Sequence, residues 1–124
     1  MNNPDVVIIE PTGIAVPESI SQTVMLNAKK TGAVLGPVIV LFDTTRTEKL
    51  LTYDTLKRLV NTQIRDADIV ALSKIDLSSV EAADYAEKAV HELNKAAKII
   101  RLSTVTGEGL SVLVDRIQEA GVQV

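Results

Sequence analysis

The sequence predicts one α/β domain built on a mostly parallel sheet with helices on both faces, a three-layer α/β/α arrangement. Short apolar segments alternate with longer amphipathic segments along the chain. The apolar segments are continuous rather than alternating, which is typical of strands covered on both faces. The 124 residues, 46% of them hydrophobic, suffice for one compact domain but not two, so we assign residues 1–124 to a single domain.

The first expected strand is Val6–Ile9, a β-branched run bounded by Asp5 and Glu10. A helix over Pro17–Lys30 follows, and Gly32 is its expected stop. These two elements begin a strict alternation of four strands and four helices, in which right-handed crossovers join parallel strands.

The second strand is expected at Val38–Phe42, after a break at Gly36 and Pro37. Apolar residues near helical spacing then predict one long crossover helix over Glu48–Ile64. The third strand is Asp68–Leu72, so the crossover runs from one buried strand to the next.

The third helix is expected at Val80–Ala97, with either Ser78 or Ser79 as its N-cap. If Ser78 is the cap, Glu81 lies where it closes a capping box. The fourth strand is Lys98–Leu102. The last helix is Leu110–Ala120, and Gly121 is expected to end it.

Composition excludes several classes of function. A net charge of −3 gives no electrostatic case for nucleic acid or an anionic membrane as a partner. No apolar run approaches the length of a membrane span and the N-terminus lacks signal-peptide features, so we expect a cytoplasmic protein. The absence of cysteine excludes disulfides and thiolate metal sites, and His91, the single histidine, cannot build a metal site of its own.

Four polar loops follow the four expected strands. In an open parallel sheet they share the carboxyl edge, where ligands are held. The loops are Glu10–Gly13, Asp43–Arg46, Ser73–Asp76 and Ser103–Gly109. We therefore expect functional residues in these loops.

The third loop, Ser73-Lys74-Ile75-Asp76, differs by one residue from Asn-Lys-x-Asp, the guanine-reading loop of GTP-binding proteins. In that loop the aspartate carboxylate accepts hydrogen bonds from the ring N–H and the exocyclic amine of guanine, and the lysine stem lies along the base; Asp76 and Lys74 stand at these two positions. Adenine has no matching pair of donors, so such a site rejects it. The motif alone leaves open a simpler interpretation, in which Lys74 and Asp76 only cap the next helix and solvate a loop.

The first loop places an acid, Glu10, three residues before a glycine, Gly13. Such a carboxylate can hold the water shell of Mg²⁺ or orient an attacking water, and the glycine N–H can approach a terminal phosphate. The alternative is an ordinary turn. The fourth loop offers the N–H groups of Ser103 and Thr104 to a base carbonyl, or is a plain strand-to-helix turn capped by Thr106.

Three segments resemble the CobW/HypB/UreG family of GTPases. Asp5–Gly13 resembles the Walker B segment, Gln63–Leu77 is similar to the helix end, strand and guanine loop, and Ser103–Leu110 is similar to the last base-contacting loop. The resemblance implies a P-loop GTPase-like fold, with GTP or GDP and Mg²⁺ as ligands and Glu10 as the Mg²⁺ residue, through water. It also implies a task of delivering a metal or a cobalamin-type cofactor to a target enzyme.

The sequence departs from that family in three ways. It contains no Gly-x-x-x-x-Gly-Lys-Ser/Thr phosphate-binding loop and no cysteine-rich metal motif, and Ser73 stands where the family has Asn. We therefore expect the chain to be the C-terminal half of a G domain, missing its N-terminal strand, that does not hydrolyse GTP alone. In the family's sheet the missing strand lies between the strands corresponding to Val6–Ile9 and Val38–Phe42.

Three kinds of partner follow from this prediction: the missing N-terminal half, a second copy bound through the exposed slot in the sheet, and a metalloenzyme client. Two other functions stay open. One is a degenerate G domain that serves as an interaction or regulatory module. The other is an unrelated flavodoxin-like or receiver-like domain, in which Asp43 imitates the acceptor aspartate but Glu10 lacks a second acid beside it.

Overall fold

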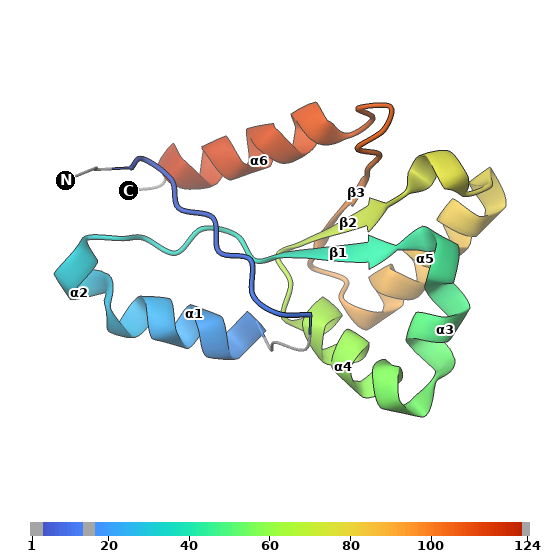
Figure 1. Cartoon of the computed structure of the whole chain (residues 1–124), viewed down its shortest axis with the longest axis horizontal. Helices are drawn as coiled ribbons and strands as arrows, with labels where there is room; N and C mark the ends of the chain where they lie inside the picture. The colour runs from blue at the N-terminus through green and yellow to red at the C-terminus, as the bar shows by residue number, and fades with distance from the viewer. Residues whose placement is uncertain (1–3, 14–16, 123–124) are drawn as a thin grey trace.

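A computed structural model describes residues 4–13 and 17–122 and contains a three-stranded parallel sheet (Figure 1). The strands are β1 (Ile39–Asp43), β2 (Ile69–Ser73) and β3 (Lys98–Arg101), and their order in the sheet is β1-β2-β3. Each lies within one residue of an expected strand. The prediction of an α/β fold with a parallel sheet is confirmed, and the arrangement agrees with a P-loop GTPase-like fold.

Six α-helices and two short 3-10 helices surround or connect the strands in the described part of the chain. The helices are α1 (Pro17–Leu26), α2 (Ala28–Thr31), α3 (Thr47–Thr52), α4 (Asp54–Arg65), α5 (Val80–Leu93) and α6 (Leu110–Val122), with the 3-10 turns η1 (Thr44–Arg46) and η2 (Ile75–Leu77). Figure 1 shows α6 on one side of the sheet and α3, α4 and α5 on the other.

The main core lies between the sheet and helices α4 and α5. The parallel register places Phe42 beside Leu72 and Val40 beside Val70, so these side chains share one face of the sheet. Apolar residues of the two helices cover that face, and the cluster consists of Phe42, Val60, Ile64, Ala67, Val70, Leu72, Ala86 and Val90. The opposite face is also buried at β2, because Ala71 is fully covered.

The predicted strand at Val6–Ile9 is wrong in this structure. The segment has no strand pairing, and its four side chains are 56–80% exposed. Backbone N–H and C=O groups form a strand only where a neighbouring strand accepts and donates hydrogen bonds. Among the described residues, β1 has a strand neighbour only on its β2 side, so the segment runs past the sheet without joining it (Figure 1).

Two of the expected helices are interrupted. Pro17–Lys30 divides at Asn27 into α1 and α2, and Gly32 ends α2 as predicted, with a left-handed backbone (φ 70°). Glu48–Ile64 divides at Tyr53, whose extended backbone (φ −68°, ψ 123°) separates α3 from α4. The Tyr53 carbonyl accepts from the Lys57 N–H (2.7 Å), so this residue begins the second helix.

The ends of α5 and α6 also differ from expectation. Ser79 caps α5 by accepting from the Ala82 N–H (3.1 Å), which decides between the two candidate caps. The helix stops at Leu93 because Asn94 turns away and uses its side-chain amide to bind the chain between α4 and β2. Gly121 lies inside α6 and does not end it.

Candidate functional site

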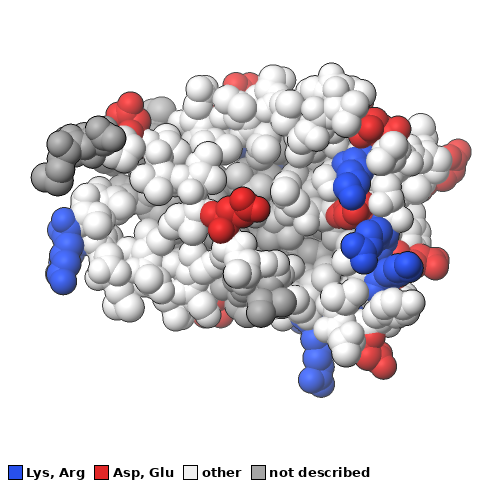
Figure 2. All heavy atoms as spheres, in the orientation of Figure 1, with Lys and Arg blue, Asp and Glu red and all other residues white. Residues whose placement is uncertain are grey.

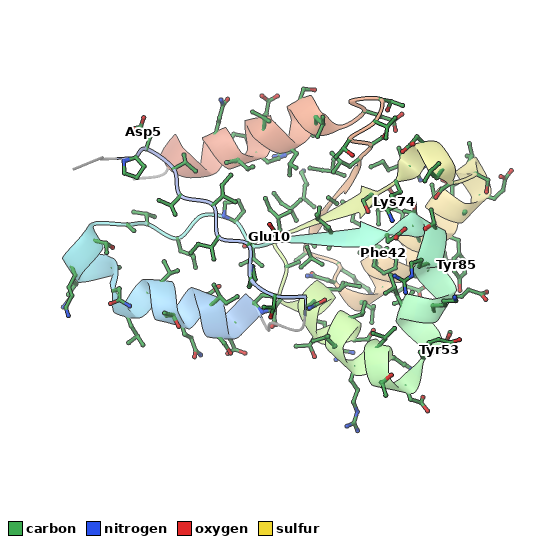
Figure 3. All side chains as sticks on the ribbon, viewed as in Figure 1. Asp5, Glu10, Phe42, Tyr53, Lys74 and Tyr85 are labelled. Carbon is green, nitrogen blue, oxygen red and sulfur yellow. The ribbon has the colours of Figure 1, made fainter. Side chains whose placement is uncertain are left out.

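Three of the four predicted loops meet at the carboxyl edge of the sheet. They follow β1, β2 and β3 directly, and the parallel register brings the ends of neighbouring strands together. Asp43 is the register partner of Ser73, so the first residue of one loop lies beside the first residue of the next. Figure 3 shows Lys74 beyond the end of the sheet, on the side of these loops.

Lys74 has an unusual backbone conformation. Its φ of 58° makes it the one non-glycine residue with positive φ among the described residues. Its Nζ lies 2.9 Å from Oδ2 of Asp43, so the side chain reaches from the end of β2 to the end of β1. The Lys74 side chain is 54% exposed although its ammonium is paired.

Asp43 is a well-held acceptor. Its Oδ1 accepts from the Thr45 N–H (2.9 Å) and the Thr45 hydroxyl (2.6 Å), and its Oδ2 accepts from Lys74. Partial burial opposes ionisation, but the Thr45 hydrogen bonds and the Lys74 ammonium outweigh it, so the pKa of Asp43 lies below its ordinary value of 3.8. The carboxylate is therefore charged at neutral pH.

Ser73, which stands where the guanine loop of the family has Asn, makes contacts of its own. Its hydroxyl donates to the Phe42 carbonyl (3.1 Å), and its carbonyl accepts from the Thr44 hydroxyl (2.7 Å). Both bonds join the end of β2 to the end of β1. The serine thus fastens the loop to the neighbouring strand.

Asp76 and Ser103 connect the second loop to the third. The Ser103 hydroxyl donates to Oδ1 of Asp76 (2.8 Å) and accepts from the N–H groups of Val105 (3.2 Å) and Thr106 (3.1 Å). Ser103 is fully buried, whereas Asp76 is exposed. None of the hydrogen bonds in the described part of the chain uses Oδ2 of Asp76. The carboxylate is thus oriented by one oxygen and open at the other.

The two backbone groups predicted to face a base carbonyl differ in their bonding. The Ser103 N–H donates to the Glu108 carbonyl (3.0 Å) inside its own loop, while no hydrogen bond of the described residues uses the Thr104 N–H. Sequence reasoning assigned Ser103 by its backbone and missed its hydroxyl. The signal in the sequence was a serine directly after the predicted strand Lys98–Leu102, because the preceding loop at the same sheet edge contains an aspartate.

A shallow pocket of about 210 Å³ lies beside Asp76. Its polar lining includes Thr106, Glu108 and Arg101, while Val80 and Ala83 contribute apolar surface. Arg101 is already paired with Asp84 (2.6 Å) and Glu87 (3.4 Å) of α5, and the Asp84 hydrogen bond is the main reason that the pKa of Arg101 is raised. Asp76, whose Oδ2 has no hydrogen bond in the described part of the chain, also lines this pocket.

Glu10 and Gly13 lie apart from this cluster. In the view of Figure 3, Glu10 and Lys74 are drawn toward opposite ends of β1. The Gly13 carbonyl accepts from Nε2 of Gln63 on α4 (3.0 Å). Their predicted roles toward Mg²⁺ and a terminal phosphate stay predictions.

The residues present do not by themselves fit a Mg²⁺ ion. The described part of the chain has no group of three or more His, Cys, Asp or Glu side chains placed to hold a metal. Glu10 offers a single exposed carboxylate, whereas protein-bound Mg²⁺ needs near-octahedral oxygen ligands and is usually shared with substrate phosphates. A separate finding concerns membranes: within residues 4–13 and 17–122, no helix is long and apolar enough to cross one.

Comparison with known proteins agrees with the motifs. The family model described as the CobW/HypB/UreG nucleotide-binding domain matches residues 1–101. The chain is also similar to the zinc-regulated GTPase metalloprotein activator 1 of Schizosaccharomyces pombe, with 30% identity over 112 residues. The alignment covers 90% of this chain and 27% of that protein, so the chain spans about a quarter of the relative's length. These matches overturn the alternative of an unrelated flavodoxin-like or receiver-like domain.

Proposed function

Because the chain belongs to the CobW/HypB/UreG family of nucleotide-binding domains, we propose that its carboxyl-edge loops bind the guanine base of GTP or GDP. One observation carries the proposal: the Ser103 hydroxyl fixes one oxygen of Asp76, and the second oxygen is left open in the described structure. A carboxylate held in this way is ready for the paired donors on the edge of guanine.

The chemistry of selection follows from the donors of the base. Guanine presents a ring N–H and an exocyclic amine side by side, and Asp76 accepts both. Adenine presents no such pair, so it leaves a desolvated carboxylate without partners. The exposed stem of Lys74 supplies a flat apolar surface against the ring, and the Thr104 N–H is free to donate to the base carbonyl.

The wider task that we propose is delivery of a metal to a metalloenzyme client. It is supported by the family match and by the relative, whose name describes a zinc-regulated activator of metalloproteins. A metal is therefore favoured over a cobalamin-type cofactor. This sequence contains no Gly-Lys-Ser or Gly-Lys-Thr, so the 124 residues alone lack the phosphate nest and the lysine that hydrolysis requires.

We also propose that a further strand completes the sheet beside β1. Among the described residues β1 has a strand neighbour only on its β2 side, so its other edge is open to a further strand. The first-choice occupant is the N-terminal half of a G domain, carrying the phosphate loop. Light scattering of the isolated protein tests this choice. A molar mass equal to two chains favours a second copy of the chain as the occupant.

The test of guanine binding is an NMR titration of the isotope-labelled chain with GDP and ADP. We expect GDP to shift the amide resonances of the Ser73–Asp76 and Ser103–Gly109 loops, and ADP at the same concentration to leave them in place. Weak affinity is expected, since the phosphates contribute the strongest charge-assisted bonds and their loop is absent from this sequence.

The variant Asp76→Asn tests the role of Asp76 through a change in nucleotide specificity. The amide of Asn accepts from the ring N–H but donates where the carboxylate accepted, so it fits xanthine, which has a carbonyl in place of the guanine amine. We expect the affinity for GDP to fall about tenfold or more and that for xanthosine diphosphate to rise. Equal affinities for both ligands in both proteins contradict the assignment of Asp76.

A second variant and a control separate binding from folding. Ser103→Ala removes the hydroxyl that orients Asp76 and should weaken GDP binding with Asp76 intact. Glu119→Gln neutralises an acid of a surface ion pair on α6, where Arg116 lies 3.2 Å away, and should leave binding unchanged. Circular dichroism of each variant verifies that it folds.

The second candidate function, an interaction or regulatory module, is favoured by the apolar surface. Figure 2 shows a mostly uncharged face, with Lys and Arg gathered mainly toward the end of the molecule where the loop cluster lies. Exposed apolar residues on the molecule include Val6–Ile9, Leu41, Val112 and Val114. If no guanine nucleotide shifts the loops, this function replaces the first.

A further inference from the structure

We propose that Asp43 is a positioning residue, whose carboxylate holds the Lys74 side chain across the carboxyl edge of the sheet and thereby sets the platform on which a purine ring lies. The inference rests on the proposed guanine site and adds to it a residue outside the guanine motif. Asp43 belongs to β1, whereas Lys74 and Asp76 lie in the loop that follows β2.

The backbone of Lys74 needs external support. A left-handed conformation is unfavourable for a residue with a Cβ, and such residues persist where surrounding contacts determine them. Two backbone bonds act locally, from the Leu77 N–H to the Lys74 carbonyl (2.9 Å) and from the Ile75 N–H to the Leu102 carbonyl (3.2 Å). Neither of these backbone bonds fixes the direction of the Lys74 side chain. That direction depends on the contact that its terminal ammonium makes.

Asp43 is suited to fix that direction. The register pairs it with Ser73, the residue just before Lys74, so the two loops leave the sheet side by side. Two donors of Thr45 hold one carboxylate oxygen and the Lys74 ammonium binds the other at 2.9 Å. An acid held by the turn that follows its own strand can impose its orientation on a long and otherwise mobile side chain.

Exposure distinguishes the two partners of this ion pair. The Asp43 side chain is 20% exposed, and that of Lys74 is 54% exposed. The acid is thus the more covered partner, and the lysine side chain is the more exposed one. A platform for a flat ring requires such a difference, since the lysine side chain has to stay open to the ring while its charge is paired.

The experiment compares Asp43→Asn with the matched control Glu119→Gln, which neutralises the acid of the Arg116 ion pair on α6. Asn keeps an acceptor for Thr45 and is a good capping residue, so the fold should survive. In the absence of nucleotide we expect Asp43→Asn to move the backbone and side-chain resonances of Lys74, and Glu119→Gln to leave them unchanged. Unmoved Lys74 resonances in Asp43→Asn overturn the proposal.

Binding of two nucleotides distinguishes a platform from an edge contact. Inosine diphosphate has the same rings as GDP but lacks the exocyclic amine that Asp76 reads. A platform acts on the ring, so Asp43→Asn should weaken both ligands by the same factor, about 2- to 5-fold for an exposed ion pair, and keep their ratio. A changed ratio means that Asp43 acts on the base edge and overturns the platform role.

Rescue supplies a third measurement. Asp43→Glu restores a carboxylate that can reach Lys74, so it should recover most of the lost affinity, whereas a merely structural role of the aspartate predicts no recovery. If the unchanged chain shifts with neither GDP nor inosine diphosphate, the proposed function fails. The Lys74 resonances then still decide whether Asp43 positions this side chain.

Discussion

Gly109 offers the sharpest test of the loop that carries Ser103. Its φ is 77°, and a Cβ built there would lie 1.9 Å from the carbonyl oxygen of Arg101, the last residue of β3. Real Cβ atoms essentially never come within 3.0 Å of such an atom, so Gly109→Ala must displace backbone by more than an ångström. The displaced carbonyl belongs to the strand that pairs with β2.

The expected cost has two parts. A residue with a Cβ in the left-handed region loses about 1–2 kcal/mol relative to glycine. Forcing backbone apart in a packed region adds about 1–3 kcal/mol, as in overpacked cores. We therefore expect Gly109→Ala to lower the free energy of unfolding by about 2–5 kcal/mol.

Gly107 provides a matched control in the same loop. Its φ is 85°, but nothing lies within 4 Å of the position of a Cβ, so Gly107→Ala carries the backbone cost alone. Urea denaturation followed by circular dichroism gives both free energies. Equal losses for the two variants would refute the argument from the Arg101 contact, and a loss near zero for both would refute the left-handed conformations as well.

Two further outcomes test single contacts, one outside the loop cluster and one within it. Asn94→Ala should cost about 2–3 kcal/mol in urea denaturation, because the Asn94 amide donates to the carbonyls of Ile64, Arg65 and Ala67 and its oxygen accepts from the N–H groups of Ala96 and Ala97. Asn61→Ala, on α4 with no side-chain hydrogen bond in the described structure, should change stability by less than about 0.5 kcal/mol, and a similar loss in both variants contradicts this role. In an NMR pH titration, the Asp43 carboxyl should titrate below 3.8 and move upward in Lys74→Met. Since its folded pKa is lowered, the stabilising contribution is present above the ordinary value and is lost as the pH falls through the folded value. An unchanged midpoint in Lys74→Met removes the lysine as a cause.

The sheet strands that pair were predictable because their apolar runs are continuous and each ends at a polar loop. Val38–Phe42, Asp68–Leu72 and Lys98–Leu102 were each placed to within a residue. Val6–Ile9 has the same composition and forms no strand, because strand formation depends on a neighbour that composition does not specify. Periodicity also cannot locate an interruption such as Tyr53, where one residue leaves the helical region and the next re-enters it.

For the candidate site, the motif identified the loops but not the bonds between them. Asp76 and Lys74 were named from a four-residue pattern. Their partners, Ser103 and Asp43, come from other strands at separations of 27 and 31 residues. Only the register of a parallel sheet brings such residues together, and side-chain direction decides which atom meets which. This is why the Ser103 hydroxyl and the Asp43 carboxylate were missed.

The same register constrains how the chain folds. Ile39 pairs with Ile69 and Ile69 with Lys98, so every strand meets its neighbour across a crossover of about thirty residues and no local hairpin exists in the described sheet. Such contacts form only after a helical segment has compacted and brought distant ends together, which slows folding relative to helical bundles. As the chain leaves the ribosome, the backbone edge of β1 stays unpaired until β2 has followed. The central strand thus has to arrive before either neighbour gains stability.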